Sequence, residues 1–331
     1  MENIMENNSS QKQAENNVNK EASAVLGNSK TQYVDQYDPE LLVTFSRNES
    51  LLASNVDIKY PYAGYDIWNM WEVSFLLDNG VPVHGVGKLV IDAKSERIIE
   101  SKSMKLYFFS FSMYKLGATK EEAINKLIQL VEMDIGSRVG LEVNFNFREI
   151  PYSSEVPLDY DRIIESVNIN NMVDVESLTI DKFTESPELL KVIKRDDIEE
   201  QDTTPSDVSF YSIPTIKTNC RVTHQADFAT GIVVIKSDEY TIDPESLIKY
   251  IASFRKEYHF HEEATHMAYD RIARLMLEAD PKAEVFVLFQ YTRRGGIDIN
   301  PIRSSSRNPF DDTLFRMLID YDTPWIKTNQ Q

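Results

Sequence analysis

The second half of this 331-residue chain repeats the pattern of the first half at a spacing of 143 residues (253 − 110). The apolar run 87–92 falls on 230–235, and the run that starts at Leu141 falls on the run that starts at Glu284. Each half is therefore predicted to contain two strands, two helices and two further strands, which indicates an α+β fold built from two duplicated units. At the same spacing Ser103, Tyr107, Ser110 and Phe111 fall on the identical residues Ser246, Tyr250, Ser253 and Phe254.

Local signals in the first half predict a hairpin followed by a capped helix. Residues 68–92 are predicted as two strands joined at Asn79-Gly80, a dipeptide that tolerates the positive φ of a tight turn. Thr119 and Glu122 match a capping box, and the apolar spacing of 123–135 predicts a helix directly after it. A strand over 141–150 is expected to close this half.

The chain divides into four segments on composition. Residues 1–35 are polar and lack apolar periodicity, so a disordered tail is predicted. Residues 36–150 form the N-terminal half, and 211–331 form the C-terminal half. The segment 151–210 between them is acidic, contains Pro and Ser, and shows weak periodicity, so it is interpreted as a connection with a small amount of structure of its own.

Charge and composition limit the partners. The formal net charge of -18 disfavours a nucleic-acid backbone or an anionic membrane, which leaves a small molecule as the expected partner. No apolar run is long enough to span a membrane, and the polar N-terminus lacks the apolar core of a signal peptide. With a single cysteine in the chain, a cytoplasmic location is expected.

Cys220 is that cysteine, and it is a candidate nucleophile. Asp227 follows it by seven positions, and the pair His261-Glu262 lies further along the same half. A thiolate is a strong nucleophile whose pKa depends on its neighbours, so an acid and a histidine nearby favour covalent chemistry. The alternative is a small buried apolar residue with no reactive role.

The two halves differ at these positions. In the 143-residue alignment Cys220 falls opposite Leu77, and Asp227 falls opposite His84. His261-Glu262 falls opposite Ala118-Thr119, so only the C-terminal half carries the nucleophile and its neighbours. The N-terminal half instead carries the charged segment that begins at Glu100, which suggests one site assembled from both halves. The alternative is that this segment is an ordinary helix start with solvated lysines.

Four separated motifs resemble one known family. The runs TNCRVTHQADF, ESKSMKLYFFSF, FHEEA and YTRRGGIDINP together resemble the NADPH-dependent 7-cyano-7-deazaguanine reductases of queuosine synthesis, in their two-module form. The resemblance extends from about residue 37 to the C-terminus. It implies the tunnelling fold, in which antiparallel sheets with helices on one face assemble side by side into a barrel. It also makes a homodimer plausible.

The resemblance assigns a covalent role to two residues. By similarity, the Cys220 thiolate attacks the nitrile carbon of the substrate to give a thioimide, and Asp227 supplies the proton that the nitrogen takes up. Two hydrides are then needed to reach the amine, so two NADPH are expected per turnover. The resemblance implies no metal.

The remaining site residues are also implied by similarity. Glu100 and Glu262 suit the purine-like ring, because a carboxylate can accept two adjacent N–H donors in one plane. Phe260 can stack on the ring, and His261 can bond its edge or relay a proton. The full substrate set is Ile99, Glu100, Ser101, Phe260, His261 and Glu262, and the NADPH set is Ser101, Lys102, Arg294 and Gly295.

Two other functions remain as alternatives. A zinc-dependent pterin or purine enzyme of the same fold could use His259, His261 and His266, but on a helix the last two point away from each other. A non-catalytic module that binds a purine-like ligand is the second alternative. The chain contains no G-x-G-x-x-G between a strand and a helix, so the dinucleotide site of a Rossmann fold is not expected.

Overall fold

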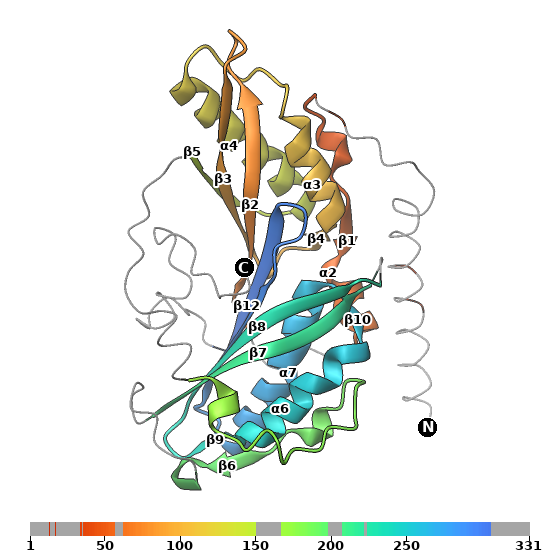
Figure 1. The fold of residues 1–331 in the computed structure, drawn as a ribbon, viewed down its shortest axis with the longest axis vertical. Helices are drawn as coiled ribbons and strands as arrows, with labels where there is room; N and C mark the ends of the chain where they lie inside the picture. The colour runs from red at the N-terminus through yellow and green to blue at the C-terminus, as the bar shows by residue number, and fades with distance from the viewer. Residues whose placement is uncertain are drawn as a thin grey trace. The chain divides into compact units, whose positions relative to one another are not determined.

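The structure is a computed structural model, and it describes residues 36–56, 62–149, 167–197, 207–221 and 224–305, with the single residues 13, 17 and 34 (Figure 1). The predicted disordered tail, 1–35, lies almost wholly outside these residues. The chain forms two compact units. The N-terminal unit consists of Met1–Asp57, Tyr65–Ser153 and Arg293–Ile299, and the C-terminal unit consists of Ile58–Gly64, Ser154–Thr292 and Asn300–Gln331.

The N-terminal unit is built on the predicted hairpin. Strands β2 (Tyr65–Leu76) and β3 (Pro82–Asp92) pair antiparallel, and β5 (Asn144–Glu149) pairs antiparallel with β3. Gly80 in the connecting turn has φ +87°, so the Asn-Gly prediction is confirmed. The first residues of β12 (Ile297–Ser304) also belong to this unit. Among the described residues of the N-terminal half, 36–150, only β5 follows the helices, whereas two strands were expected.

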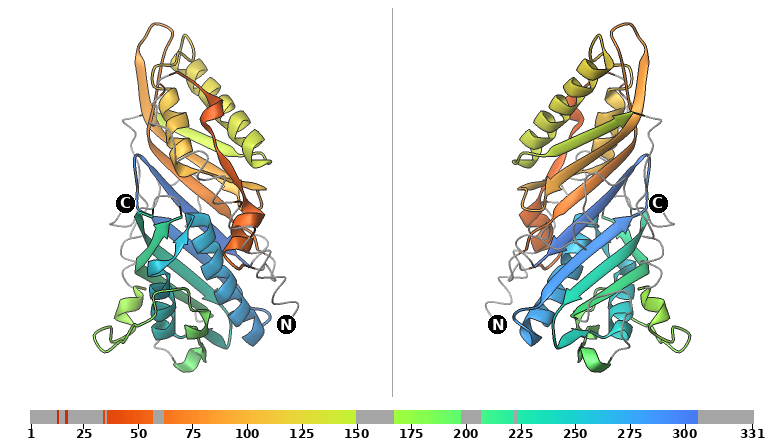
Figure 2. Two further views of the ribbon diagram at one scale, coloured as in Figure 1. Left: turned by 90° about the vertical axis from the view of Figure 1, so that its right-hand side faces the viewer. Right: turned by 90° about the vertical axis from the view of Figure 1, so that its left-hand side faces the viewer.

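Two helices cover one face of this sheet (Figure 2). They are α3 (Ser101–Ser110) and α4 (Lys120–Val139). The Thr119 hydroxyl accepts the Glu122 N–H at 3.2 Å, as the capping box predicts. The Glu122 carboxylate accepts the N–H of Ala118 rather than that of Thr119, at 3.0 Å. The smaller elements of this unit are η1 (Pro39–Leu41), β1 (Thr44–Ser46), α2 (Arg47–Ala53) and β4 (Arg97–Ile99).

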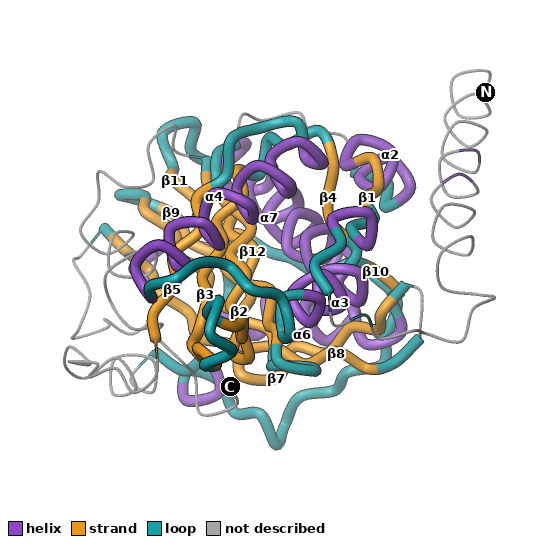
Figure 3. The backbone as a smooth tube through the Cα atoms, turned by 90° about the horizontal axis from the view of Figure 1, so that it is seen from above, coloured by secondary structure: helices purple, strands orange, loops and turns teal. Residues whose placement is uncertain are grey.

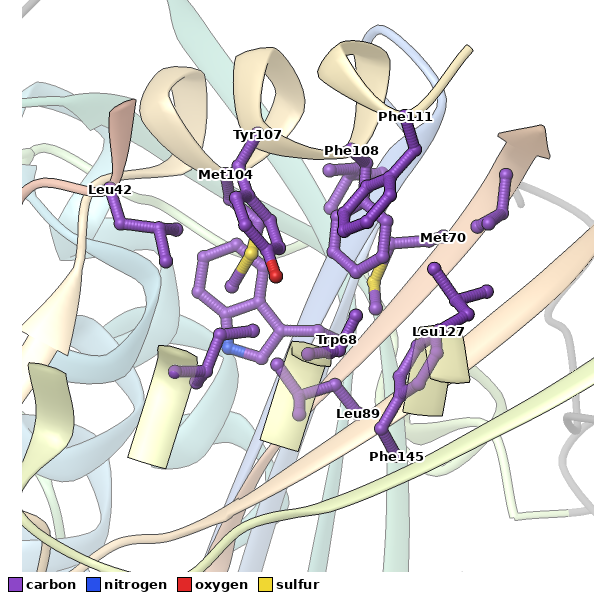
Figure 4. Packing of buried hydrophobic residues seen from close by; sticks show 14 of the residues in the cluster. Leu42, Trp68, Met70, Leu89, Met104, Tyr107, Phe108, Phe111, Leu127 and Phe145 are labelled. Atoms are coloured by element: carbon purple, nitrogen blue, oxygen red, sulfur yellow. The ribbon is translucent and has the colours of Figure 1, made fainter. Parts of the chain in front are cut away.

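The core of the N-terminal unit lies between the sheet and these helices (Figure 4). Alternate residues of β2, such as Trp68 and Met70, point to the helix side because side chains alternate along a strand. They pack against Tyr107 and Phe108 of α3 and Leu127 of α4. Each such side chain contributes about 1.5–3 kcal/mol by leaving water, so this cluster holds α3 firmly on the sheet.

The C-terminal unit has the same order of strands and helices. Figure 3 colours its helices and strands by type. Its sheet contains β7 (Val208–Cys220), β8 (Ala226–Lys236), β11 (Glu284–Tyr291) and the rest of β12, which pair antiparallel. The expectation of purely antiparallel sheets is wrong in one place, because the two-residue strand β10 (Tyr258–His259) runs parallel to β7. The other elements are β9 (Tyr240–Ile242), α6 (Pro244–Ser253), η5 (Phe254–Lys256) and α7 (His261–Ala279).

The duplication seen in the sequence is repeated in the elements. Helices α3 and α6 begin 143 residues apart, as do β4 and β9. Both long hairpins carry an irregularity at the same place, between Met70 and Val73 in β2 and between Ile213 and Ile216 in β7. The alignment slips at the longer helices, however, because α4 and α7 begin 141 residues apart (261 − 120). The expected match of His261-Glu262 with Ala118-Thr119 is therefore wrong by two positions.

The acidic segment 151–210 also contains counterparts of elements in the N-terminal unit. Strand β6 (Val192–Lys194) pairs antiparallel with β9, as β1 pairs with β4. The Ser186 N–H donates to the Ser253 hydroxyl at 3.2 Å, as the Asp38 N–H donates to the Ser110 hydroxyl at 3.3 Å. The segment also holds η2 (Ile169–Asn171), η3 (Pro187–Leu189) and η4 (Arg195–Asp197). Within the described ranges, no helix combines the length and the apolar character needed to cross a membrane.

Candidate active site

Cys220 is the last residue of β7 and begins a tight turn. Its N–H donates to the Gln225 carbonyl at 2.8 Å, and its carbonyl accepts the His224 N–H at 3.0 Å. His224 has φ +57°, a conformation that few residues other than glycine adopt and that closes the turn. The thiol is free, and Cys220 is half-buried. The buried apolar alternative for this residue therefore does not describe its surroundings.

Asp227 lies on the same face of the sheet as Cys220. It pairs directly with Thr218 across the β7–β8 ladder, and Thr218 stands two positions before Cys220. Because side chains two apart on a strand share a face, the Cys220 and Asp227 side chains are diagonal neighbours, a spacing of roughly 7–8 Å. Asp227 is only 4% exposed. The ladder thus places a buried acid beside the half-buried thiol.

His261 and Tyr291 complete this side of the site. The His261 Nε2 atom lies 3.4 Å from Asp227 Oδ2, and its ring stacks on Tyr291 with centroids 3.7 Å apart. The His261 Nδ1 atom is buried and has no hydrogen-bond partner among the described residues. Buried polar atoms are nearly always bonded, so this atom marks a place where a ligand or water can bond.

The start of α7 positions the remaining residues of this group. Phe260 precedes the first turn, and Glu262, in the first turn, is only 5% exposed. Burial raises the pKa of the Tyr291 phenol, and the negative charges of Asp227 and Glu262 raise it further, while the Thr218 side chain acts in the opposite direction. Tyr291 therefore stays neutral and lies within electrostatic range of both carboxylates.

Four charged or titratable side chains near the start of α7 contact one another in series. The Arg221 guanidinium pairs with the Glu263 carboxylate at 2.9 Å, and His259 lies between Glu263 at 3.5 Å and Glu257 at 3.2 Å. Burial acts to lower the pKa of His259, but its bonds to Glu257 and Glu263 outweigh burial, so the pKa is raised.

The zinc alternative finds no support in these contacts. His259 bonds to glutamates, His261 stacks on Tyr291, and His266 accepts a bond from the Arg303 Nε at 3.2 Å. Among the residues that the structure describes, no group of three or more His, Cys, Asp or Glu side chains is arranged to hold a metal ion.

Glu100 lies in the N-terminal unit and is the N-cap of α3. Its carboxylate accepts the N–H of Lys102 at 2.9 Å and that of Ser103 at 2.7 Å. Burial raises the pKa of Glu100, although these bonds and the charges of Lys105 and Lys102 act in the opposite direction. Ile99, at the end of β4, is buried, and Ser101 is half-buried. The carboxylate expected for the substrate therefore already holds the start of a helix.

The loop before β12 lies beside α3 in the same unit. Gly295 and Gly296 have φ +56° and +78°, and the Arg294 N–H donates to the Ile297 carbonyl at 2.9 Å. A Cβ atom on Gly295 would lie 3.4 Å from the Lys105 side chain. The loop thus brings Gly295 next to the side chain of Lys105, which lies three positions after Lys102.

Comparison with known proteins identifies the family. A family model described as "Nitrile reductase, 7-cyano-7-deazaguanine-reductase N-term" matches residues 33–147, and a model described as "QueF-like protein" matches residues 226–309. An NADPH-dependent 7-cyano-7-deazaguanine reductase of Coxiella burnetii is 34% identical over 278 residues, which are 83% of this chain and 90% of the relative. The chain belongs to the 7-cyano-7-deazaguanine reductase family. A protein of the same name from Chromobacterium violaceum is 34% identical over 274 residues, 82% of this chain and 88% of the relative.

The two family-model matches divide the candidate residues. The first match contains Ile99, Glu100, Ser101 and Lys102, and the second contains Asp227, Phe260, His261, Glu262, Arg294 and Gly295. Cys220 lies shortly before the second match. The structure thus brings together Cys220, Asp227 and His261 within the C-terminal unit, and the α3 start and the glycine loop within the N-terminal unit.

Four residues of the candidate site were not found from the sequence. Tyr291 begins the motif YTRRGGIDINP, but nothing in that motif indicates that its ring lies under His261. Arg221 and Glu263 stand inside two other quoted motifs, and their pairing joins residues 42 positions apart (263 − 221). Lys105 follows Ser101 by four positions, and helical spacing alone could have placed both on one face of α3.

Proposed function

We propose that this protein reduces the nitrile of 7-cyano-7-deazaguanine to the primary amine of 7-aminomethyl-7-deazaguanine with NADPH, in queuosine biosynthesis. Relatives named NADPH-dependent 7-cyano-7-deazaguanine reductase align with more than four fifths of the chain. The observation that carries the chemistry is the half-buried Cys220 thiol on the same sheet face as the buried Asp227. A nucleophile and an acid placed in this way suit addition to a carbon–nitrogen triple bond.

The first step forms a covalent bond to sulfur. The Cys220 thiolate attacks the nitrile carbon, one π bond of the nitrile breaks, and its electron pair moves to nitrogen. The nitrogen takes a proton, which Asp227 is placed to supply, and a thioimide results. This tether holds the substrate while it takes up four electrons in two stages.

The later steps release the sulfur and return protons. Reduction of the thioimide carbon gives a tetrahedral carbon bonded to both nitrogen and sulfur. The carbon–sulfur bond then breaks, Cys220 leaves as a thiolate, and an imine remains. Reduction of the imine gives the amine. His261, 3.4 Å from Asp227, is placed to relay the protons that nitrogen takes up. In sum, the nitrile, two NADPH and two protons give the amine and two NADP⁺.

The side chains near α3 fit NADPH. Bound NADPH supplies the two hydrides. The α3 N–H groups of Lys102 and Ser103 are already occupied by Glu100, so the helix start itself does not offer them to a phosphate. The cationic side chains of Lys102, Lys105 and Arg294 offer the charge instead, and Gly295 allows the backbone to approach closely.

The purine-like ring is assigned to two sets of residues. In the C-terminal unit, Glu262 accepts ring N–H groups, and Phe260 and His261 contact the ring face or edge. In the N-terminal unit, Ile99, Glu100 and Ser101 form the second set. Because Glu100 also caps α3, we propose that it uses its remaining lone pairs for the substrate.

We propose further that the two units are tandem tunnelling-fold modules. The repeated order of strands and helices, with helices on one face of each sheet, supports this assignment. A homodimer in the cytoplasm, with no direct binding to nucleic acid and no metal, completes the proposal.

The decisive test mixes the protein with 7-cyano-7-deazaguanine and NADPH. We expect loss of nicotinamide absorbance with two NADPH consumed per amine formed. Without NADPH, intact mass should increase by the mass of the substrate, and Cys220→Ala should abolish both the adduct and turnover. Folded protein that binds the substrate without forming an adduct or oxidising NADPH would contradict the proposal and favour a non-catalytic purine-binding module.

A further inference from the structure

The residues on either side of Cys220 are both attached to the segment that leads into α7. On the upstream side, the backbone N–H and the side-chain amide of Asn219 donate to the Glu257 carbonyl at 2.9 and 3.0 Å. On the downstream side, the Arg221 guanidinium pairs with Glu263 at 2.9 Å. The thiol therefore stands between two attachments to residues 257–263.

Glu263 is the more buried partner of the downstream attachment. Its side chain is 1% exposed and that of Arg221 is 8% exposed. The same carboxylate oxygen accepts the Phe260 N–H at 2.9 Å and lies 3.5 Å from His259 Nδ1. Burial acts to raise the pKa of Glu263, but the Arg221 charge and the bonds from His259 and Phe260 outweigh it, so the pKa is lowered. Glu263 is thus a buried anion with three partners.

The N-terminal unit contains a similar turn and the same helix position without the ion pair. The Leu77 N–H donates to the Val81 carbonyl at 2.8 Å, and the Leu77 carbonyl accepts the Gly80 N–H at 2.8 Å, so this turn is one residue shorter than the turn at Cys220. Glu122 is the third residue of α4, as Glu263 is the third residue of α7. Glu122 is exposed and only caps its helix.

The residue that follows the first residue of the turn, Leu77 or Cys220, carries opposite charge in the two units. Asp78 follows Leu77, and two acids such as Asp78 and Glu122 repel each other. Arg221 follows Cys220 and attracts Glu263. Helix capping therefore explains a glutamate at the third position of both helices, but it does not explain a buried pair with the residue after the thiol.

We propose that Glu263 is a positioning residue for the nucleophile. Its ion pair with Arg221 fixes the Cys220 turn against the first turn of α7, and so sets the distance of the sulfur from the substrate held by His261 and Glu262. The inference rests on the proposed function, because that function gives Cys220 its covalent step. Glu263 itself contacts neither the substrate nor the reacting atoms in this role.

Three variants test the proposal. Glu263→Gln keeps the side-chain length and the acceptor for Phe260 but removes the charge, while Glu263→Asp keeps the charge and shortens the side chain. Glu122→Gln is the matched control, because it makes the first change at the same helix position of the other unit. Thermal unfolding of each variant establishes that it is folded before its chemistry is compared.

The first measurement is the rate of adduct formation at Cys220 with 7-cyano-7-deazaguanine in the absence of NADPH, followed by intact mass. A displacement of about 1 Å at a reacting group slows a reaction by up to about 100-fold. We therefore expect Glu263→Gln to be about 10- to 100-fold slower, Glu263→Asp to be slower by a smaller factor, and Glu122→Gln to match the natural protein. Affinity for the aminomethyl product, which cannot form the adduct, should stay within about twofold.

The second measurement does not depend on enzyme activity. Because Cys220 is the single cysteine of the chain, alkylation by iodoacetamide reports on this thiol alone. Removal of a buried negative charge nearby favours the thiolate, so the alkylation rate of Glu263→Gln should rise at a lower pH than that of the natural protein. Glu263→Asp and Glu122→Gln should keep the natural pH profile. A residue that only caps a helix would not move this profile.

Each outcome decides the proposal. A folded Glu263→Gln variant with the natural adduct rate and alkylation profile would overturn it. If that variant does not fold, Glu263→Asp carries the test, and a natural adduct rate in that variant would overturn the proposal. If the natural protein forms no adduct, the proposed function fails, and the alkylation profiles alone then support or reject the link between Glu263 and the thiol.

Discussion

The imidazole ring of His261 lies flat on the phenol ring of Tyr291, with centroids 3.7 Å apart and ring planes 5° apart. The two residues come from different elements, since His261 begins α7 and Tyr291 ends β11. Tyr291 is fully buried and cannot move without disturbing the sheet. Its ring therefore fixes the plane of the imidazole that reaches Asp227.

Tyr291→Leu should impair the chemical step through His261. An aromatic pair is worth about 0.5–1.5 kcal/mol beyond its buried area, so loss of the stack should free the imidazole and lower kcat by about tenfold. KM for the nitrile should change less. Tyr291→Phe keeps the ring and is expected to stay near the natural rate. If Tyr291→Phe were as slow as Tyr291→Leu, the hydroxyl rather than the stack would be the important group.

Asp227→Asn tests the proton donor. The amide keeps the size of the side chain but cannot donate an acidic proton, and general acid catalysis typically contributes about 10²–10⁴-fold. We expect the rate of adduct formation at Cys220 to fall by at least about 100-fold, with little change in product affinity. Adduct formation is measured by rapid quench and intact mass. An unchanged rate would show that another group supplies the proton.

Glu262→Gln should mainly weaken substrate binding. A hydrogen bond to a charged group contributes about 1.5–3 kcal/mol, so KM for the nitrile should rise by about 10- to 100-fold while kcat falls less. Glu121→Gln is the matched control, because Glu121 is the second residue of α4 as Glu262 is of α7, and it is exposed. Steady-state kinetics of both variants separate a binding role from a general loss of helix stability.

Much of the fold followed from patterns that are local in the sequence. The Asn79-Gly80 hairpin depends on two adjacent residues, and the α4 start depends on Thr119 and Glu122 three positions apart. The 143-residue spacing aligned α3 with α6 because no insertion separates them. It failed between α4 and α7, because the chain between the two helices of the C-terminal unit is two residues shorter. An alignment at one fixed spacing cannot follow such a change in the length of a connection.

The site was harder to predict because its contacts join distant residues. The stack of His261 on Tyr291 and the pair of Arg221 with Glu263 depend on how α7 packs on the sheet, which no single motif contains. Glu100 was expected to face the substrate, but its carboxylate caps α3. Ser, Thr, Asp and Asn are the usual N-caps, so residue type alone did not indicate a glutamate in this role. Only the 143-residue alignment of Glu100 with Asp243, the N-cap of α6, indicates it.

Gly296→Ala should destabilise the loop before β12. An alanine at φ +78° is strained by about 1–2 kcal/mol, and its Cβ would lie 2.6 Å from a Glu72 carboxylate oxygen. Gly80→Ala is the control, because its φ is +87° but nothing lies within 4 Å of the added atom. We expect Gly296→Ala to lower the unfolding midpoint more than Gly80→Ala and to raise KM for NADPH. Equal midpoints would mean that Glu72 moves aside freely.

The buried charges around His259 predict how stability depends on pH. Bonds to Glu257 and Glu263 raise the pKa of His259 above its ordinary 6.5 in spite of burial and the facing Arg221 charge. A raised pKa stabilises the fold fully below 6.5, and this contribution disappears as pH rises through the folded value. The pKa values of Glu257 and Glu263 are lowered from 4.5, so their contribution is present above 4.5 and is lost as pH falls.

The network should therefore stabilise the protein most between pH 4.5 and 6.5 and less above that window. The measurement is the unfolding midpoint against pH for the natural protein and for His259→Gln. The variant should lose the decline that begins above pH 6.5, because glutamine does not titrate. A natural curve in His259→Gln would mean that His259 carries no extra proton in the folded state.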